Sequence, residues 1–292
     1  MALQKRVLHA GFAIELSGVD MRSPPPAALR AEIEGIVDEY PVVVLPAQEI
    51  TDEQQMAFCR PFGELQRSTA ARTSQDARLN AEMTDASNLG KGDKPLEAGD
   101  RRRMNNLGSR RWHTDGSFNR VPVKYSFLSG RVVAARGGET QFADMRAAYD
   151  ALPDDLRETV ENLLVEHNLL HSRAVAGFPT ATEEERATLV PMHQRLVRRH
   201  PRTGRKSLYL SSHASHIVGW PKPESMDLLY ELTEIATQRE FVYSHKWRTS
   251  DVVLWDNRVT MHRARRHVPE TAPRDMRRVS IMDTDSTLEQ VV

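Results

Sequence analysis

The chain has little cysteine, no long hydrophobic run and no excess of charge of either sign. Its 292 residues include a single cysteine, Cys59, which excludes an internal disulfide framework and four-cysteine metal sites. No run approaches the roughly 18 apolar residues that a membrane span needs, and residues 1–16 lack the apolar core of a signal peptide. We therefore expect a cytoplasmic protein with no membrane partner.

Charge and aromatic content also limit the kinds of partner. Lysine plus arginine and aspartate plus glutamate balance at 40 each, and aromatic residues make up 6% of the chain. A neutral chain without an aromatic-rich basic face is not expected to bind nucleic acid. Arginines nevertheless gather at 101–111 and at 263–278, which fits either solvated faces or a local anion site. The oligomeric state is left open, with a homo-oligomer as one option.

The pattern of apolar residues predicts a mainly β protein with helical decoration. Strands are expected within residues 6–20, at 41–46, at 139–142 and through much of the last third, and residues 125–135 are expected to form a strand pair. Helices are expected after the prolines at 24–26, after Thr51 and over about 224–239. Without repeats or linkers, residues 1–292 should form a single domain with a β-sandwich or jelly-roll core.

Two polar insertions, residues 64–111 and 173–195, interrupt this pattern. A compact domain seldom keeps so long an irregular segment without functional use. The first insertion is either a lid over an active site or an ordinary surface loop. The second is equally open to both interpretations.

The stretch Trp112-His113-Thr114-Asp115 is the first candidate for chemistry. In an extended backbone His113 and Asp115 point to the same face, because strand side chains alternate with period two. A second histidine would complete a two-histidine, one-carboxylate site, which suits Fe(II). His262, expected early on the strand that follows the turn Trp255-Asp256-Asn257-Arg258, is the candidate. Alone, the His-x-Asp pair is better explained by a hydrogen bond between the two side chains.

Four motifs occur in the order found in one enzyme family. They are Trp112-His113-Thr114-Asp115, Gly137-Gly138-Glu139-Thr140, Trp255-Asp256-Asn257-Arg258 with His262, and Arg274-x-Met276-x-Arg278. The chain thereby resembles the taurine/2,4-dichlorophenoxyacetate branch of the Fe(II)- and 2-oxoglutarate-dependent dioxygenases, over about residues 8–283. Residues 143–152, 212–216 and 236–243 resemble the aryloxyalkanoate members in particular. One extra residue near 269–273 departs from the taurine-type pattern.

The resemblance implies a fold and a role for each matching residue. The family fold is a double-stranded β-helix, in agreement with the jelly-roll expectation. His113, Asp115 and His262 would hold the iron and carry catalysis. Thr140 and Arg274 would bind the distal carboxylate of the co-substrate 2-oxoglutarate, since arginine matches a carboxylate bidentately.

Four further residues are candidates for substrate binding. Arg278 would face the anionic group of the substrate. In the aryloxyalkanoate members the segment around His213 lies near the substrate, so His213 is either a substrate contact or a structural hydrogen-bonding residue. Arg72 and Asn88, in the first insertion, could close over the substrate, with a solvated arginine as the alternative for Arg72.

The implied reaction uses O2 to convert 2-oxoglutarate to succinate and CO2 while hydroxylating a small carboxylate substrate. With an aryloxyalkanoate such as 2,4-dichlorophenoxyacetate, hydroxylation next to the ether oxygen would release a phenol and an oxo-acid. An alkylsulfonate or alkylsulfate dioxygenase of the same branch is the alternative. A non-catalytic jelly-roll binding protein is the alternative from another class.

Overall fold

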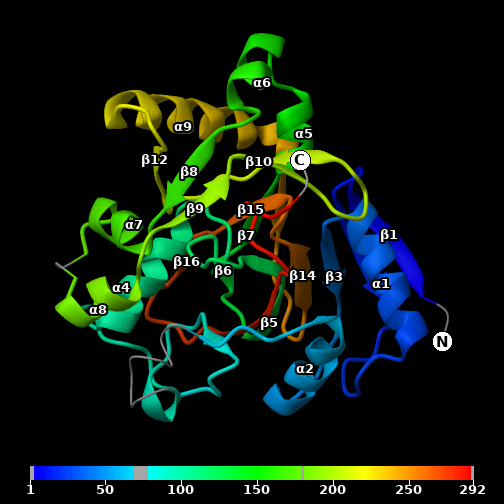
Figure 1. Cartoon of the computed structure of the whole chain (residues 1–292). Coiled ribbons are helices and arrows are strands. Elements are labelled where there is room, and N and C mark those ends of the chain that lie inside the picture. The colour runs from blue at the N-terminus through cyan, green and yellow to red at the C-terminus, as the bar shows by residue number, and fades with distance from the viewer. Residues whose placement is uncertain (1–2, 69–77, 179–180, 291–292) are drawn as a thin grey trace.

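The computed structural model describes residues 3–68, 78–178 and 181–290, and is built on a sheet of seven strands (Figure 1). The strand order is β1-β2-β3-β14-β5-β17-β4. All neighbouring strands are antiparallel except β2 and β3, which run parallel. The strands are β1 (Gln4–His9), β2 (Ala13–Ser17), β3 (Val42–Leu45), β14 (Val252–Asp256), β5 (Val123–Val132), β17 (Asp275–Met282) and β4 (Thr84–Asp85).

A smaller antiparallel sheet lies against the larger one. Its order is β13 (Val242–His245), β7 (Thr140–Asp144) and β15 (Thr260–Ala264). One apolar cluster joins the inner faces of the two sheets; it includes Val42, Leu128, Val253 and Trp255 from the larger sheet and Phe142 from the smaller one. Two sheets that enclose a core in this way confirm the predicted jelly-roll architecture.

Two further apolar clusters attach helices to this sandwich. The first lies between the larger sheet and two helices, α1 (Ala27–Glu39) and α2 (Asp52–Cys59), and α2 begins at the predicted capping box of Thr51 and Gln54. The second packs three helices with β15 and short strands. These elements are α5 (Met145–Asp150), α6 (Asp154–Val160), α9 (Lys222–Ala236), β8 (Leu164–His167), β9 (Met192–Arg195), β10 (Val197–Arg199), β11 (Lys206–Leu208) and β12 (Ala214–Ile217).

The two insertions lie on the other side of the molecule from α1 in Figure 1. The first contains β4, the 3-10 turns η2 (Lys91–Asp93) and η3 (Gly108–Arg110), and α4 (Arg101–Leu107). The second begins within α7 (Leu169–Val175) and contains α8 (Glu183–Thr188). Glu185 joins them, because its carboxylate forms ion pairs with Arg101 of α4 and Arg173 of α7. In the described part of the chain, no helix has the length and apolar character to cross a membrane.

The prediction of a strand pair over residues 125–135 is wrong, because β5 runs unbroken from Val123 to Val132. Gly130 lies within this strand and is a close-packing position. A Cβ at Gly130 would lie 3.1 Å from Cε3 of Trp247. Glycine is required there by the neighbouring indole, and β5 continues as a central strand between β14 and β17. The remaining short elements are η1 (Arg60–Phe62), β6 (Arg136–Gly137), β16 (His267–Val268) and η4 (Arg239–Phe241).

Candidate active site

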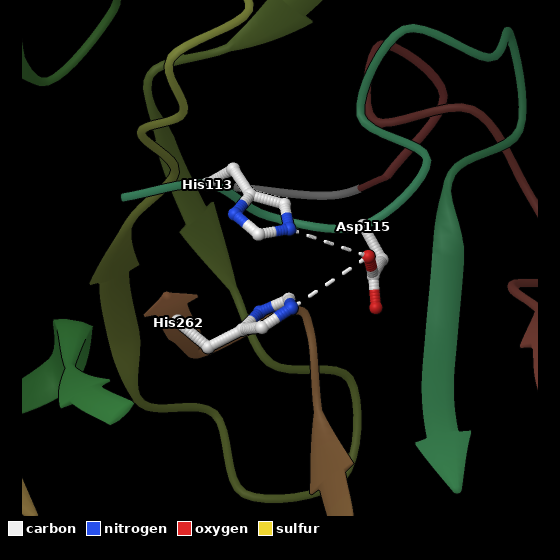
Figure 2. A group of neighbouring side chains, drawn as sticks. All are labelled: His113, Asp115 and His262. Carbon is white, nitrogen blue, oxygen red and sulfur yellow. Dashed lines mark ion pairs between the residues drawn. The ribbon is translucent and has the colours of Figure 1, made fainter. Parts of the chain in front are cut away.

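Three side chains converge inside the sandwich, as Figure 2 shows. The Nε2 atoms of His113 and His262 lie 3.8 Å and 3.7 Å from the same oxygen, Oδ1 of Asp115. One potential ligand atom from each residue lies within 4.8 Å of the other two, and all three side chains are buried. Two imidazoles and one carboxylate in this arrangement fit Fe(II) and leave coordination positions for other ligands.

The backbone explains why residues 149 positions apart meet. His113 and His262 form an antiparallel bridge, in which each N–H donates to the other carbonyl oxygen, at 3.0 Å and 2.9 Å. His262 is the third residue of β15, as the sequence predicted. The extended backbone at His113 then directs His113 and Asp115 to one side, which fits the expectation from period-two alternation.

The electrostatics keep each group in the form that binds a metal. Burial lowers the pKa of both His113 and His262, so both imidazoles are neutral at pH 7. The Nδ1 atom of His113 lies 2.9 Å from the carbonyl oxygen of Arg111, which selects the tautomer with a free lone pair on Nε2. Burial alone would raise the pKa of Asp115, but Arg278 and the two histidines lower it to about 2.

A chain of buried hydrogen bonds fixes the carboxylate of Asp115. The Ser126 hydroxyl donates to Oδ2 of Asp115 at 2.8 Å, and Nδ2 of Asn257 donates to Ser126 at 3.0 Å. Oδ1 of Asn257 accepts from the indole of Trp255 at 2.9 Å and from the Asp115 backbone N–H at 3.2 Å. With Oδ2 occupied, Oδ1 is the oxygen that faces the histidines. Partners of this kind orient metal ligands.

Sequence reasoning did not assign roles to Ser126 and Asn257. Asn257 belongs to the motif Trp255-Asp256-Asn257-Arg258, which was interpreted as a tight turn and as one of the four family motifs, with no role given to Asn257 itself. That motif is also stabilised from within, because Arg258 and Asp256 form a buried ion pair at 2.6 Å. Ser126 carries no local signal, because its partners lie 11 and 131 positions away in the chain.

Arg274 lies immediately before β17 and has no carboxylate partner in the described parts of the chain. Its guanidinium reaches only the carbonyl oxygens of Ala86 and Gly138, each at 3.4 Å. Burial, with a smaller contribution from the neighbouring Arg110, lowers the pKa of Arg274 to about 10, so the side chain is still protonated at pH 7. A partly buried cation without a counter-ion fits the distal carboxylate of 2-oxoglutarate.

Thr140 is buried at the start of β7, two residues after Gly138. Its Oγ1 accepts a hydrogen bond from the indole of Trp247 at 3.0 Å, which leaves the hydroxyl proton available to a carboxylate. Phe142, on the same face of β7, stacks on the ring of His262. Thr140 therefore faces the side of the strand on which the metal ligands lie.

Arg278 lies on β17 and forms an ion pair with Oδ1 of Asp115. The strand that bears Arg278 is not paired with the strand that bears His262. β17 pairs with β5 and β4 in the larger sheet, whereas β15 belongs to the smaller one. The arginines therefore approach the metal ligands across the sandwich, because the two sheets face each other.

A cavity of about 1210 Å³ opens from these residues toward the insertions. His113, Asp115, Arg278 and His213 are among its polar lining residues, which also include Arg78, Arg101, Arg102, Arg111 and Arg173. Its apolar lining comprises Leu79, Met83, Phe118, Leu169, Phe178 and Leu189. His213 is held by Ser172, whose Oγ lies 2.8 Å from Nδ1, and by the edge of the Phe118 ring.

Two further residues, Arg72 and Asn88, were predicted as substrate contacts. Arg72 falls outside the described residues. Asn88 is not among the described residues that line the cavity; its side-chain amide instead binds the backbone of residues 270–274. The structure thus brings together His113, Asp115, Arg278 and His213 at one cavity, with His262 beside Asp115, and bonds Asn88 to the backbone of Arg274.

Comparisons with known proteins agree with this geometry. Residues 4–280 match the family "Taurine catabolism dioxygenase TauD, TfdA family". The chain is 40% identical, over 97% of its length and 99% of the relative, to an alpha-ketoglutarate-dependent 2,4-dichlorophenoxyacetate dioxygenase of Cupriavidus pinatubonensis. It is 36% identical, over 88% of its length and 87% of the relative, to an (S)-phenoxypropionate/alpha-ketoglutarate-dioxygenase of Sphingobium herbicidovorans.

A solved structure gives the same result in three dimensions. The crystal structure of AAD-2 in complex with Mn(II) and N-oxalylglycine superposes with a TM-score of 0.91 at 48% identity. The match covers 99% of this chain and 100% of that one. N-oxalylglycine has the shape and charge of 2-oxoglutarate, and Mn(II) replaces Fe(II). The chain therefore belongs to the TauD, TfdA family of Fe(II)- and 2-oxoglutarate-dependent dioxygenases.

Proposed function

We propose that this dioxygenase hydroxylates aryloxyalkanoates such as 2,4-dichlorophenoxyacetate and thereby cleaves their ether bond. The observation that carries the proposal is the position of Arg278. Its guanidinium contacts Asp115 and also lines the cavity, so an anionic substrate held by Arg278 lies next to the metal ligands. The names of the relatives in Cupriavidus and Sphingobium agree with a substrate of this class.

The cavity supports an aromatic acid as the substrate. Arg278 offers a planar fork of N–H donors to a carboxylate. The ring of Phe118 lies 5.0 Å from that of His213, and Leu79, Met83 and Phe178 add apolar surface. A small carboxylate with an aryl group can satisfy both parts at once.

Separate groups of residues would bind the metal, the co-substrate and the substrate. His113, Asp115 and His262 would hold Fe(II), and Arg274 with Thr140 would hold the distal carboxylate of 2-oxoglutarate. When bound, these groups supply the oxidation that turns O2 and 2-oxoglutarate into succinate and CO2 and places one oxygen atom on the substrate. Arg278 would position the methylene next to the ether oxygen. The hydroxylated product is a hemiacetal, which separates into a phenol and an oxo-acid.

The test is succinate and phenol release with Fe(II), 2-oxoglutarate and O2. Substrates are phenoxyacetate, 2,4-dichlorophenoxyacetate, both phenoxypropionate enantiomers, taurine and an alkylsulfate, with His113→Ala as the inactive control. We expect phenol and succinate in equal amounts from the aryloxyacetates. Succinate coupled only to taurine or the alkylsulfate would overturn the substrate and favour the alternative. No succinate under any condition, together with no Fe(II) binding, would favour a non-catalytic binding protein.

Two expectations from the sequence stay predictions at this point. They are the cytoplasmic location and the use of residues 64–111 and 173–195 as a lid. Both insertions contribute residues to the cavity lining, which supports a role in substrate selection. Exchange of apolar lining residues such as Phe178 should therefore change the preferred aryl group.

A further inference from the structure

The first insertion supplies the edge strand of the larger sheet, β4, and its pairing with β17 continues past the end of β4. β4 pairs with β17, with Thr84 opposite Arg278 and Asp85 opposite Arg277. The same register continues, because the Ala86 N–H donates to the Met276 carbonyl at 3.0 Å and the Asn88 N–H donates to the Arg274 carbonyl at 3.1 Å. Asn88 therefore lies opposite Arg274.

The side chain of Asn88 accepts the hydrogen bond that its backbone carbonyl would accept in a regular antiparallel pair. The backbone carbonyl of Asn88 already accepts from the Leu96 N–H at 2.8 Å. The Arg274 N–H donates instead to Oδ1 of Asn88, at 2.8 Å. Thus both backbone groups of Arg274 are bonded to Asn88: the Arg274 carbonyl to the Asn88 N–H, and the Arg274 N–H to the Asn88 side chain.

The other end of the same amide fixes the loop that leads to Arg274. Nδ2 of Asn88 donates to the carbonyl oxygens of Glu270 at 3.0 Å and Ala272 at 2.8 Å. This loop, residues 269–273, carries the extra residue relative to the taurine-type pattern, and it begins and ends with proline. Proline has no N–H to donate, so the loop depends on partners outside itself. Asn88 supplies two of them.

We infer that Asn88 is a positioning residue for 2-oxoglutarate, acting through the backbone of Arg274. This inference rests on the proposed role of Arg274. Among the described residues, the hydrogen bonds of the Arg274 guanidinium go to two carbonyl oxygens, each at 3.4 Å, so its direction depends on where its backbone is held. Removing the Asn88 amide frees the 270–274 segment, and the cation must then be ordered again each time a co-substrate binds.

The experiment is calorimetric titration of the anaerobic Fe(II)-loaded protein with two 2-oxo acids. 2-Oxoglutarate carries the distal carboxylate, and 2-oxopentanoate has the same chain length without it. We expect Asn88→Ala to weaken 2-oxoglutarate roughly tenfold, as for the loss of several hydrogen bonds, and to leave 2-oxopentanoate unchanged. A purely structural defect would weaken both ligands alike.

Matched variants separate this inference from the proposed function. Asn80→Ala removes an exposed amide of the same insertion that contacts only the Glu82 N–H, and should bind both acids as the unchanged protein does. Arg274→Ala should weaken 2-oxoglutarate more strongly than Asn88→Ala. If Asn88→Ala lowers the melting temperature strongly, Asn88→Asp is used instead. Aspartate keeps the side-chain volume and the oxygen that accepts from the Arg274 N–H, but lacks the N–H groups that donate to Glu270 and Ala272.

Each outcome has a definite meaning. An unchanged 2-oxoglutarate affinity in Asn88→Ala, with a weakened one in Arg274→Ala, would overturn the inference alone. Equal losses for both acids in Asn88→Ala would also overturn it. An unchanged affinity in Arg274→Ala would overturn the proposed role of that arginine, and the inference with it.

Discussion

The metal end and the outer end of the active-site cavity are held together by different forces. At the metal end, His113 and His262 are joined by backbone hydrogen bonds between strands, and Asp115 is fixed by a buried chain of side chains. At the outer end, the two insertions meet through ion pairs of Glu185, and the side chain of Arg101 is 58% exposed. Partly exposed ion pairs contribute little stability each.

This difference separates the reaction from substrate recognition. The groups that would hold Fe(II) are positioned by the core of the sandwich. They can therefore stay the same while the two insertions that line the cavity change in sequence. The outer ends of the cavity walls are joined to each other by ion pairs of Glu185, and relatives that are 40% and 36% identical to this chain carry names that give different substrates. The following predictions test the comparison, from the largest expected effect to the smallest.

Ser126→Ala tests how firmly the metal end is held. Oδ2 of Asp115 would lose its hydroxyl donor, and the carboxylate would be free to rotate. We expect Fe(II) affinity, measured by anaerobic titration, to fall roughly 10- to 100-fold, as is usual for such partners of metal ligands. Ser129→Ala is the matched control, because Ser129 is buried on the same strand but donates to Gln55. Equal metal affinities in the two variants would contradict the role of Ser126.

His167→Phe tests a buried histidine that has no metal to bind. Its ring stacks on Tyr209, and neither nitrogen has a hydrogen-bond partner in the described residues. Burial lowers the pKa of His167 to about 3, whereas the unfolded chain binds the proton near pH 6.5. The folded state therefore loses stability as pH falls from about 6.5 toward 3, by about 2 kcal/mol between pH 7 and 5.

The measurement is urea unfolding of both proteins at pH 7 and pH 5. The phenylalanine variant should lose less free energy of unfolding over this interval, by about the same 2 kcal/mol. An identical pH dependence in the two proteins would show that folding does not lower the pKa of His167. The metal-binding histidines remain in both proteins, so their contribution cancels.

Glu185→Gln tests the outer end, where the smallest effect is expected. The change removes the ion pairs with Arg101 and with Arg173, the latter at 3.2 Å. Because such pairs contribute at most about 1 kcal/mol, the KM for the aryloxyacetate should change by about fivefold or less, with unchanged Fe(II) affinity. Glu82→Gln, which breaks the Arg60–Glu82 pair away from the cavity, is the control. A fall in Fe(II) affinity would show that the two ends are coupled.

The metal end could be predicted from the sequence because its signals are short and ordered. His113 and Asp115 are two residues apart in an extended stretch, and His262 follows a recognisable turn. The helices predicted after Thr51 and over about 224–239 were found for the same reason, since caps and helical spacing are local; the second is α9, which ends at Ala236. Local patterns of this kind carry information about the elements that contain them.

What could not be predicted depends on contacts between distant residues. Gly130 has the form of a turn residue, and only the position of Trp247 explains why β5 continues through it. Nothing in the sequence around Ser126 distinguishes it from other serines, and only its contacts with Asp115 and Asn257 reveal its role. Asn88 was assigned to the substrate because it lies in the insertion, but its partners are residues 270–274, more than 180 positions away.

The pairing of residues 84–88 with β17 has a consequence for building chimeras from related enzymes. A designer who exchanges the first insertion to obtain a new substrate also exchanges the segment that holds the backbone of Arg274. Such a chimera would inherit a changed requirement for co-substrate along with its new specificity. Residues 84–88 and 269–278 should therefore be transplanted as one unit, with the crossover points placed on either side of both.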